Sequence, residues 1–205
     1  MDLPSSTYRV QLNKDFNFRD LTNILDYLDN LGISAVYAAP ILKSRPGSSH
    51  GYDVLDPHMI DPEIGTLDEL RDLSKELKRR NMLWVQDIVP NHMAFDHRNE
   101  RLMDVFERGP SSPYYNYFDI DWNHFLPEYK GKIAVPFLGA ERDECIAKGE
   151  IKINFINHAF VVQYYDSTYP ISLTALESIS GALGITSEVS AFVSESKVLS
   201  LNDWL

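Results

Sequence analysis

The sequence predicts an α/β fold in which parallel strands alternate with helices. Apolar runs typical of strands occur three times, at residues 7–12, 33–39 and 83–89. Helical periodicity of apolar residues separates them, which indicates right-handed parallel crossovers. The third run ends at Pro90 among polar residues, and α/β barrels and doubly wound sheets both gather their sites at that end of the strands. The fold is therefore expected to be one of these two.

Two helices are expected between the three strands. In the first, apolar residues recur at helical spacing from Phe18 to Leu31, and Gly32 is expected to end it. The second begins with a capping box at 66–69 and continues with leucines through Leu77. Between the second strand and this helix lie a long loop at 43–53 and a turn at 61–65, and loops of that length tend to be functional or disordered.

The pattern changes after His92. The sequence predicts a helix at 96–108 ended by Gly109 and a loop with dense aromatic residues at 110–122. Strand-like runs follow at 133–138, 150–156 and 159–165, the last two forming a hairpin that turns at Asn157 and His158, and two helices follow from Ser172. We therefore expect two parts, an N-terminal α/β part at 1–92 and a separate subdomain at 93–205, inserted after the third strand.

Composition excludes several classes of protein. A net charge of −11 argues against a nucleic-acid partner, because a phosphate-binding surface needs basic residues. The charge fits a neutral or cationic small-molecule partner and equally fits plain solubility. Cys145 is the single cysteine, so no intrachain disulfide or cysteine metal site is expected. Neither a secretory signal nor a membrane span is evident, so we expect no membrane partner and a cytoplasmic location.

Two groups of residues are candidates for a binding site. In the long loop, the Tyr52 ring could stack on a sugar while His50 and Asp53 hydrogen-bond its hydroxyl groups. The alternative is a loop stabilised by its own polar residues. At the end of the third strand, His92 could bind the ligand while Asp87 and Asn91 order the loop. The alternative has Asp87 accepting backbone N–H groups, with His92 a satisfied histidine.

No metal or cofactor is expected. Asp119 and Asp121 could bind a metal or act as acid and base, but turn formation is the favoured interpretation. The remaining histidines lack the spacing of zinc ligands. Glycine motifs that bind nucleotides are absent, and so is the Gly-x-Ser-x-Gly motif of serine hydrolases.

Several motifs together resemble the α-amylase superfamily, glycoside hydrolase family 13. Residues 87–92, Asp-Ile-Val-Pro-Asn-His, are similar to that family's first signature at the end of its third strand, and 49–53, Ser-His-Gly-Tyr-Asp, to its substrate loop. Within the superfamily, the maltooligosyltrehalose synthases are the most similar group. Further motifs support this resemblance, at residues 7–12, 34–40, 51–57, 118–122 and 131–139.

The resemblance implies a (β/α)8 TIM-barrel fold, of which this chain would hold the first three β/α units plus the inserted subdomain. It also implies that Tyr52 stacks on the glucose at the reaction centre and that His50, Asp53 and His92 belong to the substrate-binding site. Asp87 and Asn91 would be supporting residues. The family's catalytic carboxylates lie on later strands, so none is expected in this chain, and 205 residues are fewer than the about 250 of a complete barrel.

The reaction implied by the resemblance turns the reducing-end α-1,4 bond of a maltooligosaccharide or starch-type glucan into an α,α-1,1 bond, giving maltooligosyl trehalose. The isolated chain is expected to be inactive and to need the missing C-terminal part as a partner. Two other functions stay open: a different α-amylase-type hydrolase and a non-catalytic glucan-binding remnant. The aromatic segment 114–122 is expected to help cover the acceptor site and to exclude water.

Overall fold

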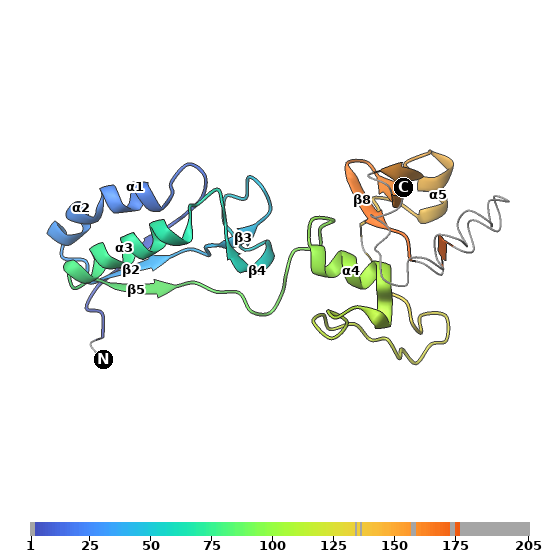
Figure 1. Cartoon of the computed structure of the whole chain (residues 1–205), viewed down its shortest axis with the longest axis horizontal. Helices are drawn as coiled ribbons and strands as arrows, with labels where there is room; N and C mark the ends of the chain where they lie inside the picture. Colours follow the sequence, from blue (N-terminus) through green and yellow to red (C-terminus); the bar gives the residue numbers. More distant parts are fainter. Residues whose placement is uncertain (1–2, 134, 136, 157–158, 173–174, 177–205) are drawn as a thin grey trace. The chain divides into compact units, whose positions relative to one another are not determined.

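The computed structural model describes residues 3–133, 135, 137–156, 159–172 and 175–176. The chain divides into two compact units, residues 1–95 and 96–205, each with its own sheet (Figure 1). No helix within the described residues is long and apolar enough to cross a membrane.

The first unit is built on a sheet of three parallel strands, which confirms the predicted α/β pattern. The strands are β1 (Thr7–Val10), β2 (Ala35–Ala38) and β5 (Leu83–Gln86), in the spatial order β1-β2-β5. They are shorter than the predicted runs, but Ala39 N still donates to Val10 O at 2.9 Å and Asp87 N to Ala38 O at 3.0 Å. Pairing therefore extends to the residues that carry the candidate site.

Three helices connect these strands: α1 (Phe18–Asn23), α2 (Leu25–Asn30) and α3 (Leu67–Arg79). The single helix predicted over 18–31 is wrong in one respect, because Ile24 has φ −101° and ψ 2° and breaks it in two. Asn17 caps α1 through its side chain, and the predicted capping box of Thr66 and Glu69 opens α3. Gly32 follows with φ +80°, as a residue that ends a helix should.

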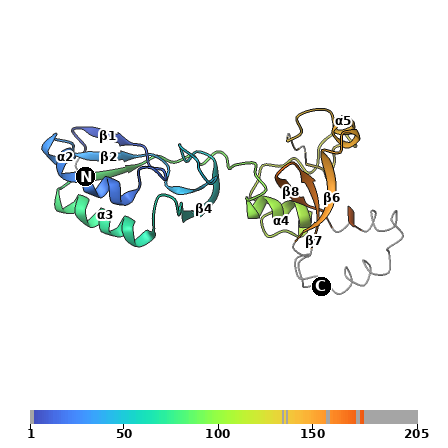
Figure 2. The same ribbon diagram turned by 90° about the horizontal axis from the view of Figure 1, so that it is seen from above.

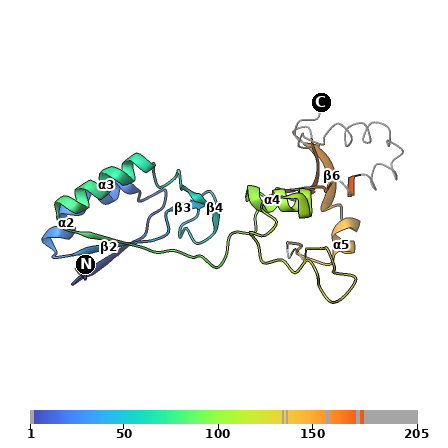
Figure 3. The ribbon, with the colours of Figure 1, turned by 60° about the horizontal axis from the view of Figure 1, so that its bottom comes forward.

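The helices cover one face of the β1–β2–β5 sheet (Figures 1 and 3). Leu21, Leu25 and Leu28 are fully buried there against Val36 of β2. The parallel register places a different set of side chains on the opposite face: Arg9, Tyr37, Leu83 and Val85. Leu83 and Val85 keep 41% and 40% of their surface exposed. The buried core and the candidate site thus use opposite faces of one sheet.

A short antiparallel pair, β3 (Leu42–Ser44) and β4 (Val54–Ile60), was missed by the sequence analysis. Its register shifts at both steps of β3, and Pro57 lies within β4, so neither segment shows the alternation that signals a strand. The pair holds the two ends of the long loop together. The predicted turn at 61–65 is confirmed by hydrogen bonds from Ile64 N and Gly65 N to Asp61 O, at 3.0 and 3.1 Å.

The second unit packs helices beside an antiparallel sheet of three strands, side by side in Figure 2. Its helices are α4 (Glu100–Arg108), the 3-10 turn η1 (Gly109–Ser111) and α5 (Arg142–Ala147). The strands are β6 (Ile151–Ile156), β7 (Ala159–Tyr164) and β8 (Ser167–Pro170). Pairing of β6 with β7 confirms the predicted hairpin, although its turn at Asn157 and His158 lies outside the described residues.

Several predictions for the second unit need correction. The predicted helix 96–108 begins only at Glu100, because Asn99 caps it and Asp96 lies in the preceding turn. The strand predicted at 133–138 is wrong for residues 133, 135, 137 and 138, which form none. Helix α5 and strand β8 were missed, being six and four residues long. The helices predicted from Ser172 onward lie almost entirely outside the described residues.

The long loop between β3 and β4 is held by hydrogen bonds within it and to the turn that follows β4. Gly47 N donates to both carboxylate oxygens of Glu63, at 3.1 and 2.9 Å, and Ser48 Oγ donates to Asp53 Oδ1 at 2.5 Å. Gly51 has φ +75°, and a Cβ added there would lie 2.8 Å from the carbonyl oxygen of Pro40. The loop therefore passes so close to the end of β2 that only glycine fits.

We predict that Gly51→Ala destabilises the chain more than Gly47→Ala does. Both glycines have a left-handed φ, +75° and +76°, so both substitutions cost about 1–2 kcal/mol of backbone strain. A Cβ on Gly47 would meet nothing within 4 Å, whereas on Gly51 it must displace backbone, which costs about 1–3 kcal/mol more. Urea unfolding followed by circular dichroism measures both. Equal losses would contradict the close approach of loop and strand.

Candidate functional site

A hydrogen bond joins the long loop to the end of the third parallel strand. Tyr52 OH lies 2.6 Å from Asp87 Oδ2, across 35 residues of sequence. Strand β5 places Asp87 there, while Gly51 turns the loop so that Tyr52 reaches it. Both side chains are half-buried. The two groups of residues singled out in the sequence thus meet at one edge of the sheet.

Two further side chains complete the cluster, and both come from the sheet face that the helices leave uncovered. Tyr37 OH of β2 donates to the same Asp87 Oδ2 at 3.2 Å. Arg9 Nη2 of β1 donates to Tyr52 OH at 3.3 Å, and the guanidinium carbon lies 5.7 Å from the centre of the Tyr37 ring. Each strand of the sheet therefore delivers one polar group: Arg9, Tyr37 and Asp87.

The direction of each hydrogen bond in this cluster follows from its chemistry. A carboxylate only accepts and a guanidinium only donates. The single phenolic proton of Tyr52 must therefore go to Asp87, and its oxygen accepts from Arg9. The Asp87 carboxylate raises the pKa of Tyr52 above its ordinary value, while Arg9 acts in the opposite direction and offsets part of this effect.

The two histidines fix the backbone of Tyr52, and this defines their tautomers. His92 Nε2 lies 3.0 Å from Tyr52 O, and because a carbonyl only accepts, Nε2 carries the proton. His50 Nδ1 accepts from Tyr52 N at 3.0 Å, so the proton of its neutral ring lies on Nε2. The rings of His50 and Tyr52 stack with centres 5.9 Å apart. His50 thus presents a donor and His92 an acceptor on its other ring nitrogen.

Asp53 and Asn91 take positions different from the other candidates. Asp53 Oδ1 accepts from Ser48 Oγ at 2.5 Å, so this oxygen helps to order the loop. Asn91 is exposed in the turn after Pro90. The structure therefore brings His50, Tyr52, Asp87 and His92 together, while Asp53 is bonded within the loop and Asn91 is exposed.

The sequence analysis missed Arg9 and Tyr37 as members of this cluster. A signal for Arg9 existed: in a strand, alternate residues share a face, so Arg9 and Gln11 lie together opposite the apolar Val10. Arg9 Nη1 does donate to Gln11 Oε1, at 3.1 Å. Tyr37 carried no such signal, because an aromatic residue inside an apolar strand is usually part of the core.

The described residues contain no group of three His, Cys, Asp or Glu side chains that could hold a metal ion. Asp121 Oδ1 accepts from Asn123 N at 3.2 Å, an arrangement typical of a turn. Asp119 is exposed. The contact of Asp121 is thus one of turn formation.

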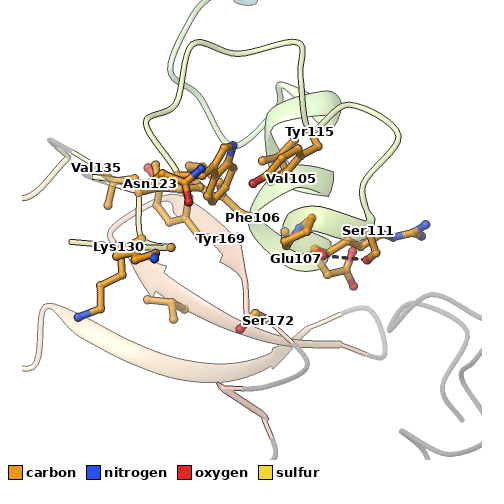
Figure 4. Close-up of a pocket in the computed structure, with 18 of the residues that line it drawn as sticks. Val105, Phe106, Glu107, Ser111, Tyr115, Asn123, Lys130, Val135, Tyr169 and Ser172 are labelled. Carbon is orange, nitrogen blue, oxygen red and sulfur yellow. Dashed lines mark hydrogen bonds between the residues drawn. The ribbon is translucent and has the colours of Figure 1, made fainter. Parts of the chain in front are cut away.

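The second unit contains a cavity of about 1070 Å³ between α4, the aromatic segment and the sheet (Figure 4). Tyr115 and Trp122 line it and stack on each other with ring centres 4.6 Å apart. Tyr169 of β8 and Val105 of α4 line the other walls. Tyr117 of the same segment points its edge against Tyr114 but keeps 62% of its surface exposed. The segment thus supplies both a wall of the cavity and an exposed ring.

The chain is similar in sequence to known proteins. The family description "Alpha amylase, catalytic domain" matches residues 4–146. A putative maltooligosyl trehalose synthase of Mycobacterium tuberculosis (strain CDC 1551 / Oshkosh) is 44% identical over 145 residues, covering 67% of this chain and 18% of that protein. The chain therefore spans about a fifth of the length of this relative.

Solved structures agree with this likeness. A crystal structure of maltooligosyl trehalose synthase has 43% sequence identity and a TM-score of 0.75, over 82% of this chain and 22% of that one. A hypothetical maltooligosyl trehalose synthase of Sulfolobus tokodaii has 39% identity and a TM-score of 0.69, over 92% and 24%. The chain belongs to the α-amylase catalytic-domain family, and hence to a family of (β/α)8 TIM barrels.

Proposed function

We propose that this chain supplies the substrate-binding wall of an enzyme that forms maltooligosyl trehalose. The substrate would be a maltooligosaccharide or a starch-type α-1,4-glucan, whose reducing-end α-1,4 bond is converted to an α,α-1,1 bond. The observation that supports this most is the hydrogen-bonded cluster of Tyr52, Asp87, His50 and His92 at one edge of the sheet. The names of the relatives, maltooligosyl trehalose synthases, point to the same reaction.

In this proposal each residue has a distinct part. The Tyr52 ring stacks on the apolar face of a glucose unit. His50 donates from Nε2 to one sugar hydroxyl, and His92 accepts from another at Nδ1. Asp53 makes its contact through Oδ2, because Oδ1 already accepts from Ser48. Asp87 and Asn91 support the loop, Asp87 through the phenol of Tyr52.

The bond-breaking groups lie outside this cluster. A retaining transfer needs a carboxylate nucleophile and a carboxylic acid that protonates the leaving oxygen, about 5–5.5 Å apart. The carboxyl group at the centre of the cluster, that of Asp87, is occupied by two phenols. We propose that residues 1–92 form the first three β/α units of the barrel, that residues 93–205 are inserted after the third strand, and that later barrel strands carry the reacting carboxylates. The 205-residue chain alone would bind glucan without converting it.

The products formed from maltopentaose distinguish the proposed function from the two alternative functions. A different α-amylase-type hydrolase would release glucose or maltose from maltopentaose, with no non-reducing product. A non-catalytic glucan-binding protein would bind maltopentaose and leave it unchanged even when joined to the remaining barrel strands. The proposed enzyme would instead remove reducing ends without releasing an equivalent amount of sugar.

Tyr52→Ala should weaken binding of maltopentaose by the chain about fivefold, because a stacked aromatic ring contributes on the order of 1 kcal/mol. Chemical-shift perturbation during a maltopentaose titration measures the affinity. Tyr27→Ala, which removes a 60% exposed tyrosine from α2, is the matched control and should bind like the parent chain. A Tyr52→Ala protein with an intact fold and unchanged affinity would contradict the proposed site.

His50→Asn tests the hydrogen bond from the His50 ring to the sugar separately from its role in the loop. An Asn carbonyl can still accept from the N–H two residues on, so the contact of His50 Nδ1 with Tyr52 N is replaced. The donor at Nε2 is lost. We expect a several-fold weaker affinity for maltopentaose with an unchanged urea midpoint. If affinity stays the same and only stability falls, His50 orders the loop and does not touch the sugar.

Tyr117→Ala tests the proposed cover of the acceptor site. In the complete enzyme, the freed glucose must attack before water does, so losing part of the cover should raise the ratio of released glucose to trehalose product. Tyr117 is 62% exposed and its removal should leave the fold intact, whereas Trp122→Ala would also disturb the stack with Tyr115. Tyr27→Ala is again the control. An unchanged ratio in Tyr117→Ala would count against the cover.

A further inference from the structure

We propose that Arg9 is a positioning residue, which holds the Tyr52 ring in the orientation needed to stack on a sugar. This inference rests on the proposed function, because it assigns a role to Arg9 in the same binding site. Arg9 comes from the first strand, 43 residues before Tyr52, and belongs to none of the motifs of the binding loop. Its role is visible only in the folded chain.

The guanidinium group of Arg9 is itself held in place on three sides. Nη2 donates to Tyr52 OH at 3.3 Å and Nη1 donates to Gln11 Oε1 at 3.1 Å. The group also lies over the Tyr37 ring, with its carbon 5.7 Å from the ring centre. A planar guanidinium with two anchored branches is well oriented before any ligand arrives. Lysine, a single point charge on a flexible stem, could reproduce one of these contacts but not both.

The phenol oxygen of Tyr52 is thereby hydrogen-bonded to two partners. It donates to Asp87 Oδ2 at 2.6 Å and accepts from Arg9 at 3.3 Å. Rotation of the ring about its own axis leaves the oxygen in place, but swinging the ring away breaks both bonds at once. The His92 bond to Tyr52 O fixes the backbone at the other end of the residue. Tyr52 is therefore presented as a rigid platform whose phenolic proton is already committed to Asp87.

Structural support alone does not explain Arg9. Its side chain is exposed and takes no part in the hydrophobic core of the first unit. An arginine needed only for folding would be expected to be buried itself, as Arg80 is, which pairs with Glu76 and Asp26 and keeps 9% of its side chain exposed. The contacts of Arg9 instead converge on one phenol at the edge of the sheet.

Titratable side chains from every neighbouring element lie around Tyr52, and two of them, Arg9 and Asp87, act on its pKa. Arg9 lies on β1, Tyr37 on β2, Asp87 directly after β5 and His50 in the loop of Tyr52 itself. The Asp87 carboxylate raises the pKa of Tyr52, and Arg9 lowers it. If removal of Arg9 loosens the Tyr52 ring, the phenol loses its bond to Asp87 and its pKa should fall back towards the ordinary value of about 10. If the ring stayed against Asp87 without Arg9, the pKa of Tyr52 would instead rise further, and removing the charge of Asp87 should lower it.

The test follows the phenol of Tyr52 by NMR in the 205-residue chain, with ¹³C-labelled tyrosine and assignment by Tyr52→Phe. Arg9→Met and Asp87→Asn should both shift the Tyr52 titration to lower pH, because each removes the bond of the phenol to the Asp87 carboxylate or the charge behind it. Arg71→Met, on an arginine of α3 with 63% side-chain exposure, controls for the loss of one positive charge and should leave Tyr52 unchanged. An upward shift or no shift in Arg9→Met overturns the positioning role, because the ring then stays against Asp87 without Arg9.

Maltopentaose affinity completes the test. Arg9→Met should bind several-fold more weakly with an unchanged urea midpoint, and Arg9→Lys should recover part of the loss. Unchanged affinity in Arg9→Met overturns the inference even if the titration shifts as expected. The two proposals fail separately: if Tyr52→Ala binds as well as the parent chain, the sugar site is wrong, whereas weak binding by Tyr52→Ala with normal binding by Arg9→Met removes only the role of Arg9.

Discussion

The hydrogen bond between Tyr52 and Asp87 is the contact on which the arrangement of the site depends. It joins two side chains that are 35 residues apart in the sequence, at 2.6 Å. It thereby fastens the long loop to the residue that follows strand β5. Everything around it limits where the phenol can lie: Gly51 allows the loop to pass Pro40, and His92 holds the backbone of Tyr52. In the proposed binding site, affinity would come from preorganisation, because the entropy of ordering the ring is lost on folding and not on binding.

The sheet explains why these side chains meet. In a parallel sheet, partners in register on neighbouring strands point to the same side, so Arg9 and Tyr37 occupy one row and Asp87 follows one step further along β5. The helices cover the other face with a leucine-rich core. The face beneath the helices is therefore specified by packing, which tolerates few substitutions. The opposite face can carry polar side chains, and the strands set the spacing between them.

The sequence was sufficient for the elements with strong periodicity. Three parallel strands, the capping box of Thr66 and the hairpin β6–β7 followed from local patterns. The β3–β4 pair did not, because its bulges and Pro57 remove the alternation on which strand prediction relies. The meeting of Tyr52 with the end of β5 could be expected from the rule for strand ends. The hydrogen bond from Arg9 to Tyr52 could not be expected, because it depends on the register of β1 with β2 and on the direction in which a long side chain extends.

The opposite charges of Arg9 and Asp87 suit the cluster to an enclosed environment. Asp87 is half-buried and Arg9 is exposed in the first unit by itself, while Leu83 and Val85 on the same face are about two-fifths exposed. In a closed barrel this face lies inside, where an unpaired carboxylate would be costly to bury. Arg9 and Asp87, linked through the phenol of Tyr52, form a neutral, hydrogen-bonded chain. Such a chain can be enclosed without an uncompensated charge, and a lower dielectric constant would strengthen its hydrogen bonds. The same contacts that orient the ring would thus also make its enclosure in a barrel energetically acceptable.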